Sequence, residues 1–297
     1  MGLKVSKVSK SYNGKKVVDN ISFELDKPGV YGLLGSNGAG KTTTIRMILG
    51  ILSKDSGTIE WNGKPVKREN VKFGYLPEER GIYPKTKLYD QLMYFARLKG
   101  MSKTEANIAI EKWCKKLEVY DYINKPAEQL SKGNQQKVQF ITAIIHTPEL
   151  LVLDEPFSGL DPVNTKIIKG VIEELIANGT YIILSSHQMP VVEEYCRDIL
   201  ILNKGKTKLQ GNLGEIKKSY GRNNLLIGTY EEIEKLIPNN VEIIEKKANG
   251  YEIKLQSEDI AQEILANLVS NKIVLQKFEI KEPSLQEIFI EKVGASE

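Results

Sequence analysis

A run of glycines, a lysine and a hydroxyl residue near position 40 has the composition and spacing of a phosphate site. The run is Gly35-Ser36-Asn37-Gly38-Ala39-Gly40-Lys41-Thr42. Residues 30–34 before it predict a buried strand, and residues 43–49 after it predict a helix. Glycines allow backbone N–H groups to turn toward an anion, and a helix N-terminus adds partial positive charge. The segment therefore predicts a loop that binds a nucleoside triphosphate.

Two side chains at the end of this loop have the chemistry to act on the nucleotide. The Lys41 ammonium is expected to contact the β- and γ-phosphates, and the Thr42 hydroxyl is expected to bind Mg²⁺. Thr43 completes the expected nucleotide contacts. An ordinary glycine turn before a helix is the alternative, but the upstream strand and all four specified positions favour the phosphate loop.

A pair of acids follows a second apolar run, residues 150–153. Downstream of a phosphate loop, Asp154 is in the place where an acid holds Mg²⁺, usually through water. Glu155 is one residue further and is predicted to polarise the attacking water. Such general-base assistance typically accelerates a reaction about 10²–10⁴-fold.

Composition limits the class of protein. The 297 residues include 41% hydrophobic and 27% charged residues, which is ordinary for a folded domain with a sizeable core. Cys114 and Cys196 lie far apart, and the N-terminus does not resemble a signal peptide, so a reducing cytoplasmic location is expected. No apolar run approaches the ~20 residues needed to cross a bilayer. A role at a membrane would therefore need a partner.

Charge is unevenly distributed along the chain. The net charge is +4, but residues 1–212 hold thirty-one basic and twenty-three acidic side chains, and residues 213–297 hold eleven and fifteen. The mild overall charge does not by itself indicate nucleic acid as a partner. The difference between the two parts is consistent with two domains.

The pattern of the first 212 residues predicts the elements that must position these side chains. Residues 3–25 and 57–61 are rich in strand formers, and residues 88–145 are mostly helical in pattern. Short apolar strands at 150–153 and 181–184 flank a helix at 162–178. This order predicts a parallel α/β core interrupted by an inserted helical subdomain.

The pattern changes after Gly211. It predicts a strand at 225–230, a short helix at 231–237 and a hairpin of 241–246 with 251–256. A helix at 257–270, capped by Ser257, a strand at 273–280 and a final helix at 284–293 follow. This βαββαβα order is typical of a small ferredoxin-like module. It contains no cluster of catalytic residue types, so regulation, dimerisation or partner contact is expected.

The segment Leu130-Ser131-Lys132-Gly133-Asn134-Gln135-Gln136 resembles the Leu-Ser-Gly-Gly-Gln signature of ATP-binding cassette (ABC) ATPases. The resemblance implies that ATP and Mg²⁺ are bound and that Ser131, Lys132, Gly133 and Asn134 face the γ-phosphate held by another subunit's phosphate loop. Lys132 and Asn134 depart from the family pattern, which has glycine and glutamine at these positions.

Other family marks occur in the expected order. The resemblance implies that Asp161 is the D-loop acid that positions the opposing site and that His187 is the switch histidine at the γ-phosphate. Tyr12 matches the aromatic residue that stacks on adenine. Glu78 occupies the position of the glutamine that contacts Mg²⁺, and an acid can still accept metal-bound water there. His146 has no such neighbours and is interpreted as structural.

The resemblance covers residues 1–212 and implies an α/β, ABC-type P-loop NTPase fold with an antiparallel β subdomain and a helical subdomain at about 88–145. Residues 213–297 would form the accessory α+β ferredoxin-like domain. The motif Leu-Pro-Glu-Glu-Arg-Gly at 76–81 and the tail at 283–290 resemble ATP-binding subunits of ABC-2-type exporters, a group that includes sodium-extrusion and drug-resistance systems. Such a subunit hydrolyses ATP on the inner face of the cell membrane. Its partners are a separate permease and a second nucleotide-binding domain, a homodimer mate or a paralogue.

Two other classes fit the sequence less well. Ribosome-acting relatives usually carry two cassettes, DNA-repair relatives carry long coiled coils, and this chain has one phosphate loop and only 113 residues from Lys41 to Asp154. No nucleic acid is therefore expected. A metabolic kinase would lack the signature and the switch histidine. Import, rather than export, stays open, and the cargo is not encoded here, because specificity in such systems resides mainly in the permease.

Overall fold

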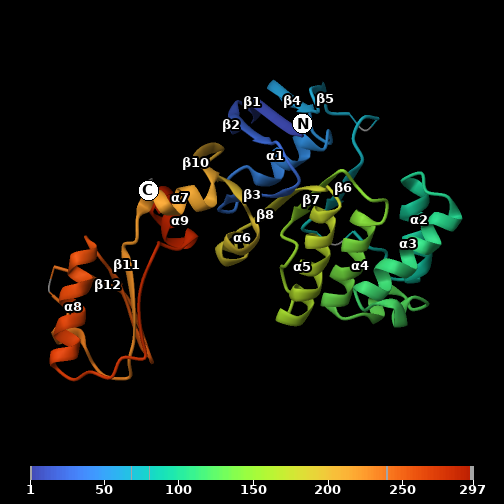
Figure 1. Ribbon diagram of the computed structural model, residues 1–297. Helices are drawn as coiled ribbons and strands as arrows, with labels where there is room; N and C mark the ends of the chain where they lie inside the picture. Colours follow the sequence, from blue (N-terminus) through green and yellow to red (C-terminus); the bar gives the residue numbers. More distant parts are fainter. Residues whose placement is uncertain (1, 68, 80, 239, 295–297) are drawn as a thin grey trace. The chain divides into compact units, whose positions relative to one another are not determined.

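The computed structural model describes residues 2–67, 69–79, 81–238 and 240–294, and the chain divides into two compact units, residues 1–210 and 211–297 (Figure 1). Each unit has its own hydrophobic core. The first unit contains the phosphate loop, the acid pair and the signature. The second contains the tail segment.

The first unit begins with an antiparallel sheet in the order β2-β1-β4-β5. Its strands are β1 (Leu3–Tyr12), β2 (Lys15–Leu25), β4 (Ser56–Trp61) and β5 (Lys64–Pro65). Alternate residues of β1 and β2 are buried, as expected for strands with one face on a core. The expected antiparallel β subdomain is thus present.

A second sheet of the first unit has the order β10-β9-β3-β8-β7-β6. The strands are β10 (Lys206–Asn212), β9 (Asp198–Asn203), β3 (Gly29–Gly35), β8 (Tyr181–Ser186), β7 (Leu150–Asp154) and β6 (Phe73–Leu76). The pairs β9–β3, β3–β8, β8–β7 and β7–β6 are parallel. Their carboxyl ends therefore meet at one edge, where ligands of open α/β sheets bind.

Helices complete the first unit (Figure 1). They are α1 (Lys41–Ile48), α2 (Leu88–Leu98), α3 (Lys103–Lys116), α4 (Lys132–Ile144), α5 (Pro162–Ala177) and α6 (Met189–Tyr195). The chain from β6 to β7 inserts α2, α3 and α4 together with the 3₁₀ turns η1 (Tyr120–Tyr122) and η2 (Ala127–Gln129). These three helices contact one another and form the predicted helical insertion.

The core of the first unit lies between its two sheets and α1. The apolar faces of β1 and β2 pack with β3 and α1, and Leu33, Ile45 and Ile48 are fully buried there. All five residues of β7 are buried, which explains its continuous apolar run. The phosphate loop thus connects two elements that are both fixed in one core.

The second unit contains a four-stranded sheet in the order β12-β13-β11-β14. Its elements are α7 (Leu213–Tyr220), β11 (Asn224–Gly228), η3 (Glu234–Leu236), β12 (Glu242–Lys247), β13 (Gly250–Lys254), α8 (Glu258–Ser270), β14 (Lys277–Lys281) and α9 (Leu285–Gly294). All neighbouring strands are antiparallel, and the sheet order is that of a split βαβ module.

One expectation for this unit was wrong, one helix was missed, and one helix cap was confirmed in position only. The helix predicted at 231–237 is only the 3₁₀ turn η3. This short turn is enough to bury both Ile233 and Ile237 in the core. Helix α7 was not predicted at all. Ser257 precedes α8, but its side chain makes no capping hydrogen bond.

In the described part of the chain, the helices are all too short or too polar to cross a membrane.

Candidate functional site

An open cleft of about 390 Å³ lies at the carboxyl edge of the parallel sheet. Phosphate-loop residues and three acids line it: Val17, Asn37, Gly38, Ala39, Gly40, Lys41, Thr42, Thr43, Glu78, Asp154 and Glu155. The volume is in the range of ligand pockets, roughly 300–1,000 Å³. The structure therefore brings the glycine loop and the acid pair, 113 residues apart in sequence, to one site.

The loop backbone leaves no room for side chains at its helix-starting glycine. Gly40 precedes α1 with a φ of 105°. A Cβ atom there would come within 2.8 Å of the Val17 carbonyl oxygen. The loop is also tied to the β9–β10 turn, because the Gly205 N–H donates to the Ala39 carbonyl at 3.1 Å. The loop is thus held in shape by neighbouring backbone.

Lys41 bends over the loop from the first turn of α1. Its Nζ donates to the carbonyl oxygens of Gly35 at 2.7 Å and Ser36 at 3.3 Å. Lys41 is only 8% exposed, and burial lowers its pKa, with Glu155, Asp154 and Glu78 acting in the opposite direction. A phosphate in the cleft would be an anionic partner for this ammonium and would offset the free-energy cost of burying its charge.

Asp154 ends β7 and is almost fully buried. The Ser185 hydroxyl, on the neighbouring strand β8, donates to its carboxylate. Burial raises the pKa of Asp154 above its usual value, and the nearby Glu78 carboxylate adds to this effect. A divalent cation would offset the cost of a buried charge here, so the donor set fits Mg²⁺.

Glu155 is held from two directions by the end of β8. Its Oε1 accepts from the His187 backbone N–H at 2.9 Å and lies 2.7 Å from His187 Nδ1, and the Ser186 hydroxyl donates to Oε2 at 3.3 Å. Its backbone φ is +51°, in the left-handed region that non-glycine residues rarely occupy. This combination of strain and fixed contacts is typical of functional positions.

The other predicted nucleotide contacts vary in their position. Asn37, Thr42, Thr43 and Glu78 line the cleft, whereas Gly35, Ser36 and Tyr12 do not appear among its lining residues. Tyr12 ends β1, is 46% exposed and lies beneath the Lys10 ammonium, whose Nζ is 5.7 Å from the ring centroid. Adenine stacking on Tyr12 stays a prediction. Arg80, in the motif that contains Glu78, lies outside the described residues.

The signature residues and Asp161 are away from this cleft. Ser131 caps α4, its Oγ accepting from the Asn134 N–H at 3.3 Å, and Lys132 is exposed. Asp161 caps α5. None of Ser131, Lys132, Gly133, Asn134 or Asp161 lines the cleft. A role for them at a phosphate requires a second copy of the site.

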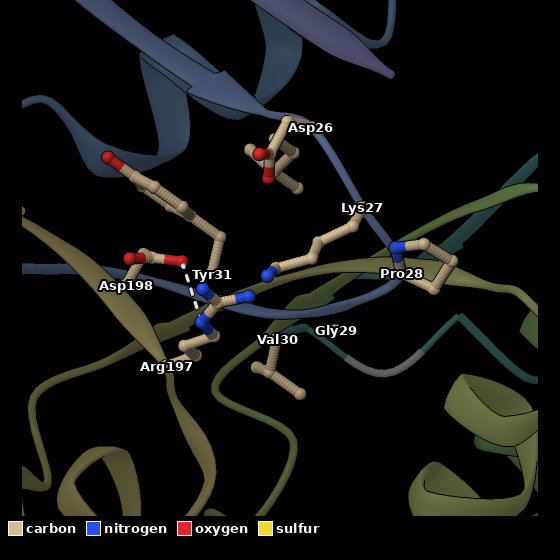
Figure 2. A pocket seen from close by; sticks show the side chains of 9 residues that line it. Asp26, Lys27, Pro28, Gly29, Val30, Tyr31, Arg197 and Asp198 are labelled. Carbon is tan, nitrogen blue, oxygen red and sulfur yellow. Dashed lines mark ion pairs between the residues drawn. The ribbon is translucent and has the colours of Figure 1, made fainter. Parts of the chain in front are cut away.

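Two other hollows in the surface differ in chemistry from the phosphate-loop cleft. One, at the amino ends of β3 and β9, holds about 20 Å³, which is room for little more than a water molecule (Figure 2). The other, about 560 Å³, is an apolar groove bordered by Lys72, Lys99 and His146. His146 Nε2 is 2.8 Å from the Phe73 carbonyl oxygen. Asp26 and Asp198 line the smaller hollow, but the residues lining either hollow include no phosphate loop.

The sequence did not single out several residues that hold the site. Ser185 and Ser186 orient the two acids, and Val17 contacts the cleft from β2. The parallel register places Asp154 opposite Ser185, so aligning the two strand ends in sequence would have identified the first serine. No comparable feature of the sequence would have identified Val17.

The site and the fold together define a P-loop nucleotide-binding domain of the ABC type. A family model for ABC transporters matches residues 18–158, and one for the C-terminal domain of DrrA1-3-like ATP-binding proteins matches residues 211–293. The chain is 49% identical over 99% of both chains to an uncharacterized ABC transporter ATP-binding protein, YhaQ, of Bacillus subtilis. The chain therefore belongs to the ATP-binding subunits of ABC transporters.

A more distant relative and a solved structure agree with this assignment. The linearmycin resistance ATP-binding protein LnrL of Bacillus subtilis is 28% identical over 98% of both chains. The solved structure of an ATP-binding subunit of an ABC transporter superposes with a TM-score of 0.69 and 31% identity, covering 74% of this chain and 94% of that one.

Proposed function

We propose that this subunit hydrolyses ATP in the cleft and uses ATP-driven pairing of two nucleotide-binding domains to power an ABC-2-type exporter. The observation that carries the proposal is Glu155, a buried carboxylate fixed beside the phosphate loop by the His187 backbone and ring. A carboxylate so placed is suited to accept a proton from water.

The protein's own groups supply most of the proposed chemistry. The glycine loop and Lys41 bind and orient the phosphates. Glu155 takes the proton of the attacking water, and His187 holds the carboxylate in one orientation. Thr42, Asp154 and Glu78 would hold Mg²⁺, which when bound neutralises charge on the β- and γ-phosphates.

The trans half of the site would come from a second nucleotide-binding domain. Ser131, Lys132, Gly133, Asn134 and Asp161 lie outside the cleft of their own chain, so a facing copy is needed to bring them to its γ-phosphate. Bound ATP would then join the two copies, and hydrolysis would separate them. The mate is a second copy of this chain or a paralogue.

The Glu155→Gln variant tests this proposal. We expect it to bind ATP with near-normal affinity, to lose hydrolysis by about 10²–10⁴-fold and to form a dimer with Mg-ATP in light scattering. Glu173→Gln, a change on the exposed face of α5, is the matched control. Unchanged turnover in Glu155→Gln would contradict the role of Glu155, and a monomer under all conditions would contradict the dimer.

The partner is proposed to be a separate permease that anchors this subunit at the inner face of the cell membrane. The apolar groove offers a surface for it: Ile51 and Leu98 are 55% and 67% exposed there, beside Lys72 and Lys99. This chemistry fits an amphipathic segment with acidic residues. The resistance function in the name of one relative favours export.

Co-purification with the cognate permease tests the partner proposal. Leu98→Asp should release the permease and leave ATP affinity unchanged, since Leu98 does not line the cleft. Tyr94→Asp, an exposed change on the same helix outside the groove, is the control. Equal recovery of the permease with Leu98→Asp would reject the groove as its docking site.

A further inference from the structure

Three contacts connect the signature helix α4 to the segment that follows β7. Gly133, in the first turn of α4, lies so close to α5 that a Cβ atom on it would be 2.9 Å from Asn164 Nδ2 and 3.7 Å from Leu160 Cδ2. Further along α4, Gln136 is buried, and its Nε2 donates to the Pro156 carbonyl at 3.3 Å. The Gly133 backbone therefore packs closely against the side chains of Asn164 and Leu160, where small changes are felt.

Asn164 is at the centre of the junction between the first turn of α4 and the start of α5. Its backbone N–H donates to Asp161 Oδ1 at 2.8 Å, and its side-chain Nδ2 donates to Asp161 Oδ2 at 2.5 Å. The same Nδ2 would be the closest side-chain neighbour of a Cβ atom placed on Gly133. One amide side chain thus contacts the cap of α5 on one side and the first turn of α4 on the other.

The charges around the junction favour the same arrangement. Lys137, one turn after Gly133, is 2% exposed, and burial lowers its pKa while Glu118 and Asp161 act to raise it. The Asn164 backbone N–H is the main reason that the pKa of Asp161 is lowered, and Lys137 adds to that effect. The Asn164 backbone N–H and Lys137 thus both favour the charged form of Asp161.

We infer that Asn164 is a positioning residue that fixes Asp161 and the first turn of α4 as one rigid surface, so that both reach the partner's ATP together. This inference rests on the proposed dimer. Because both partners of the Asn164 side chain are predicted trans-site groups, loosening it should weaken pairing without touching the cleft in the same chain.

Asn164→Asp and Asn164→Ala test the inference in the full-length protein. Aspartate keeps the shape but places a second carboxylate beside Asp161, whereas alanine removes the donor without adding charge, so an effect shared by both variants reports the lost donor. We expect hydrogen–deuterium exchange of residues 131–137 to become about tenfold faster in both variants, because the hydrogen bond to Asp161 that holds the Asn164 side chain against Gly133 is lost. Asn178→Ala, at the other end of α5, should leave exchange unchanged.

A second measurement places the same changes in the Glu155→Gln background. ATP-dependent dimerisation should weaken about tenfold or more, while the ATP affinity of the monomer stays within about twofold. Unchanged exchange in residues 131–137, or unchanged dimerisation despite faster exchange, would overturn the inference. Failure of the parent Glu155→Gln protein to dimerise would instead overturn the proposed function, and exchange alone would then decide whether Asn164 joins the two helices.

Discussion

The environment of Lys41 favours a bound anion, because its buried ammonium donates to neutral carbonyl oxygens. Its buried ammonium contacts two loop carbonyls, and burial lowers its pKa. We expect Lys41→Ala to lose ATP affinity by about 100-fold, because charge-assisted contacts to phosphate disappear, while stability changes little. Calorimetric titration with Mg-ATP measures this, with the exposed Lys64→Ala as control. Retained affinity would contradict the role of Lys41.

Two glycines of the phosphate loop allow steric and conformational costs to be separated. Gly38 and Gly40 both have positive φ, 78° and 105°, but only Gly40 has a backbone carbonyl in the path of a Cβ atom. Gly38→Ala should cost about 1–2 kcal/mol of unfolding free energy from its left-handed backbone. Gly40→Ala should cost about 1–3 kcal/mol more, because it adds a clash with Val17. Equal urea midpoints for the two variants would contradict this prediction and show that the loop shifts to avoid the clash with Val17.

Among the elements, α3 has a complete N-terminal capping box. The Ser102 Oγ accepts from the Glu105 N–H at 3.2 Å, and Glu105 Oε2 accepts from the Ser102 N–H at 2.7 Å. Ser102→Ala should therefore cost about 1 kcal/mol of unfolding free energy. Urea unfolding followed by tryptophan fluorescence measures it, since both tryptophans, Trp61 and Trp113, lie in the first unit. The nearby change Thr104→Ala removes neither hydrogen bond of the capping box and should cost nothing, so an equal loss there would argue against the cap.

The elements of the ATP-binding core were predictable because their chemistry and pattern coincide. The strand before the loop is the buried β3, the acid pair lies at the end of the fully buried β7, and the predicted helix at 162–178 is α5. Each has a strong apolar run and a distinctive end: a glycine at the end of β3, an acid pair at β7 and the capping residue Asp161 before α5. Local pattern and tertiary role thus agree for these elements.

The errors fall where local pattern and packing conflict. Ile233 and Ile237 have helical spacing, yet they enter the core around the short turn η3. The missed helix α7 did have signals, since Asn212 caps it through the Glu215 N–H and Gly221 follows its last turn. The contact of Asn164 with Gly133 was beyond prediction, because it depends on how closely α4 and α5 pack.

At the scale of the whole molecule, His146 couples protonation to the stability of the first unit. Its ring contacts the Phe73 carbonyl through Nε2, and its Nδ1 is buried without a partner among the described atoms. Burial lowers the pKa of His146 to about 4, and the nearby Lys99 and Lys72 act in the same direction. A charged ring would thus meet one acceptor and two cations.

The sign of the resulting pH dependence follows from proton binding. Because the folded pKa of about 4 is below the ordinary value of 6.5, the unfolded chain binds more protons between these values. Stability is therefore complete above about pH 6.5 and falls as the pH decreases, by about 2 kcal/mol between pH 7 and pH 5. In His146→Gln, which keeps a donor for Phe73 but cannot titrate, urea midpoints should lose this part of the pH dependence. An unchanged slope of stability against pH in that variant would mean that other groups, and not His146, set the acid limit of the fold.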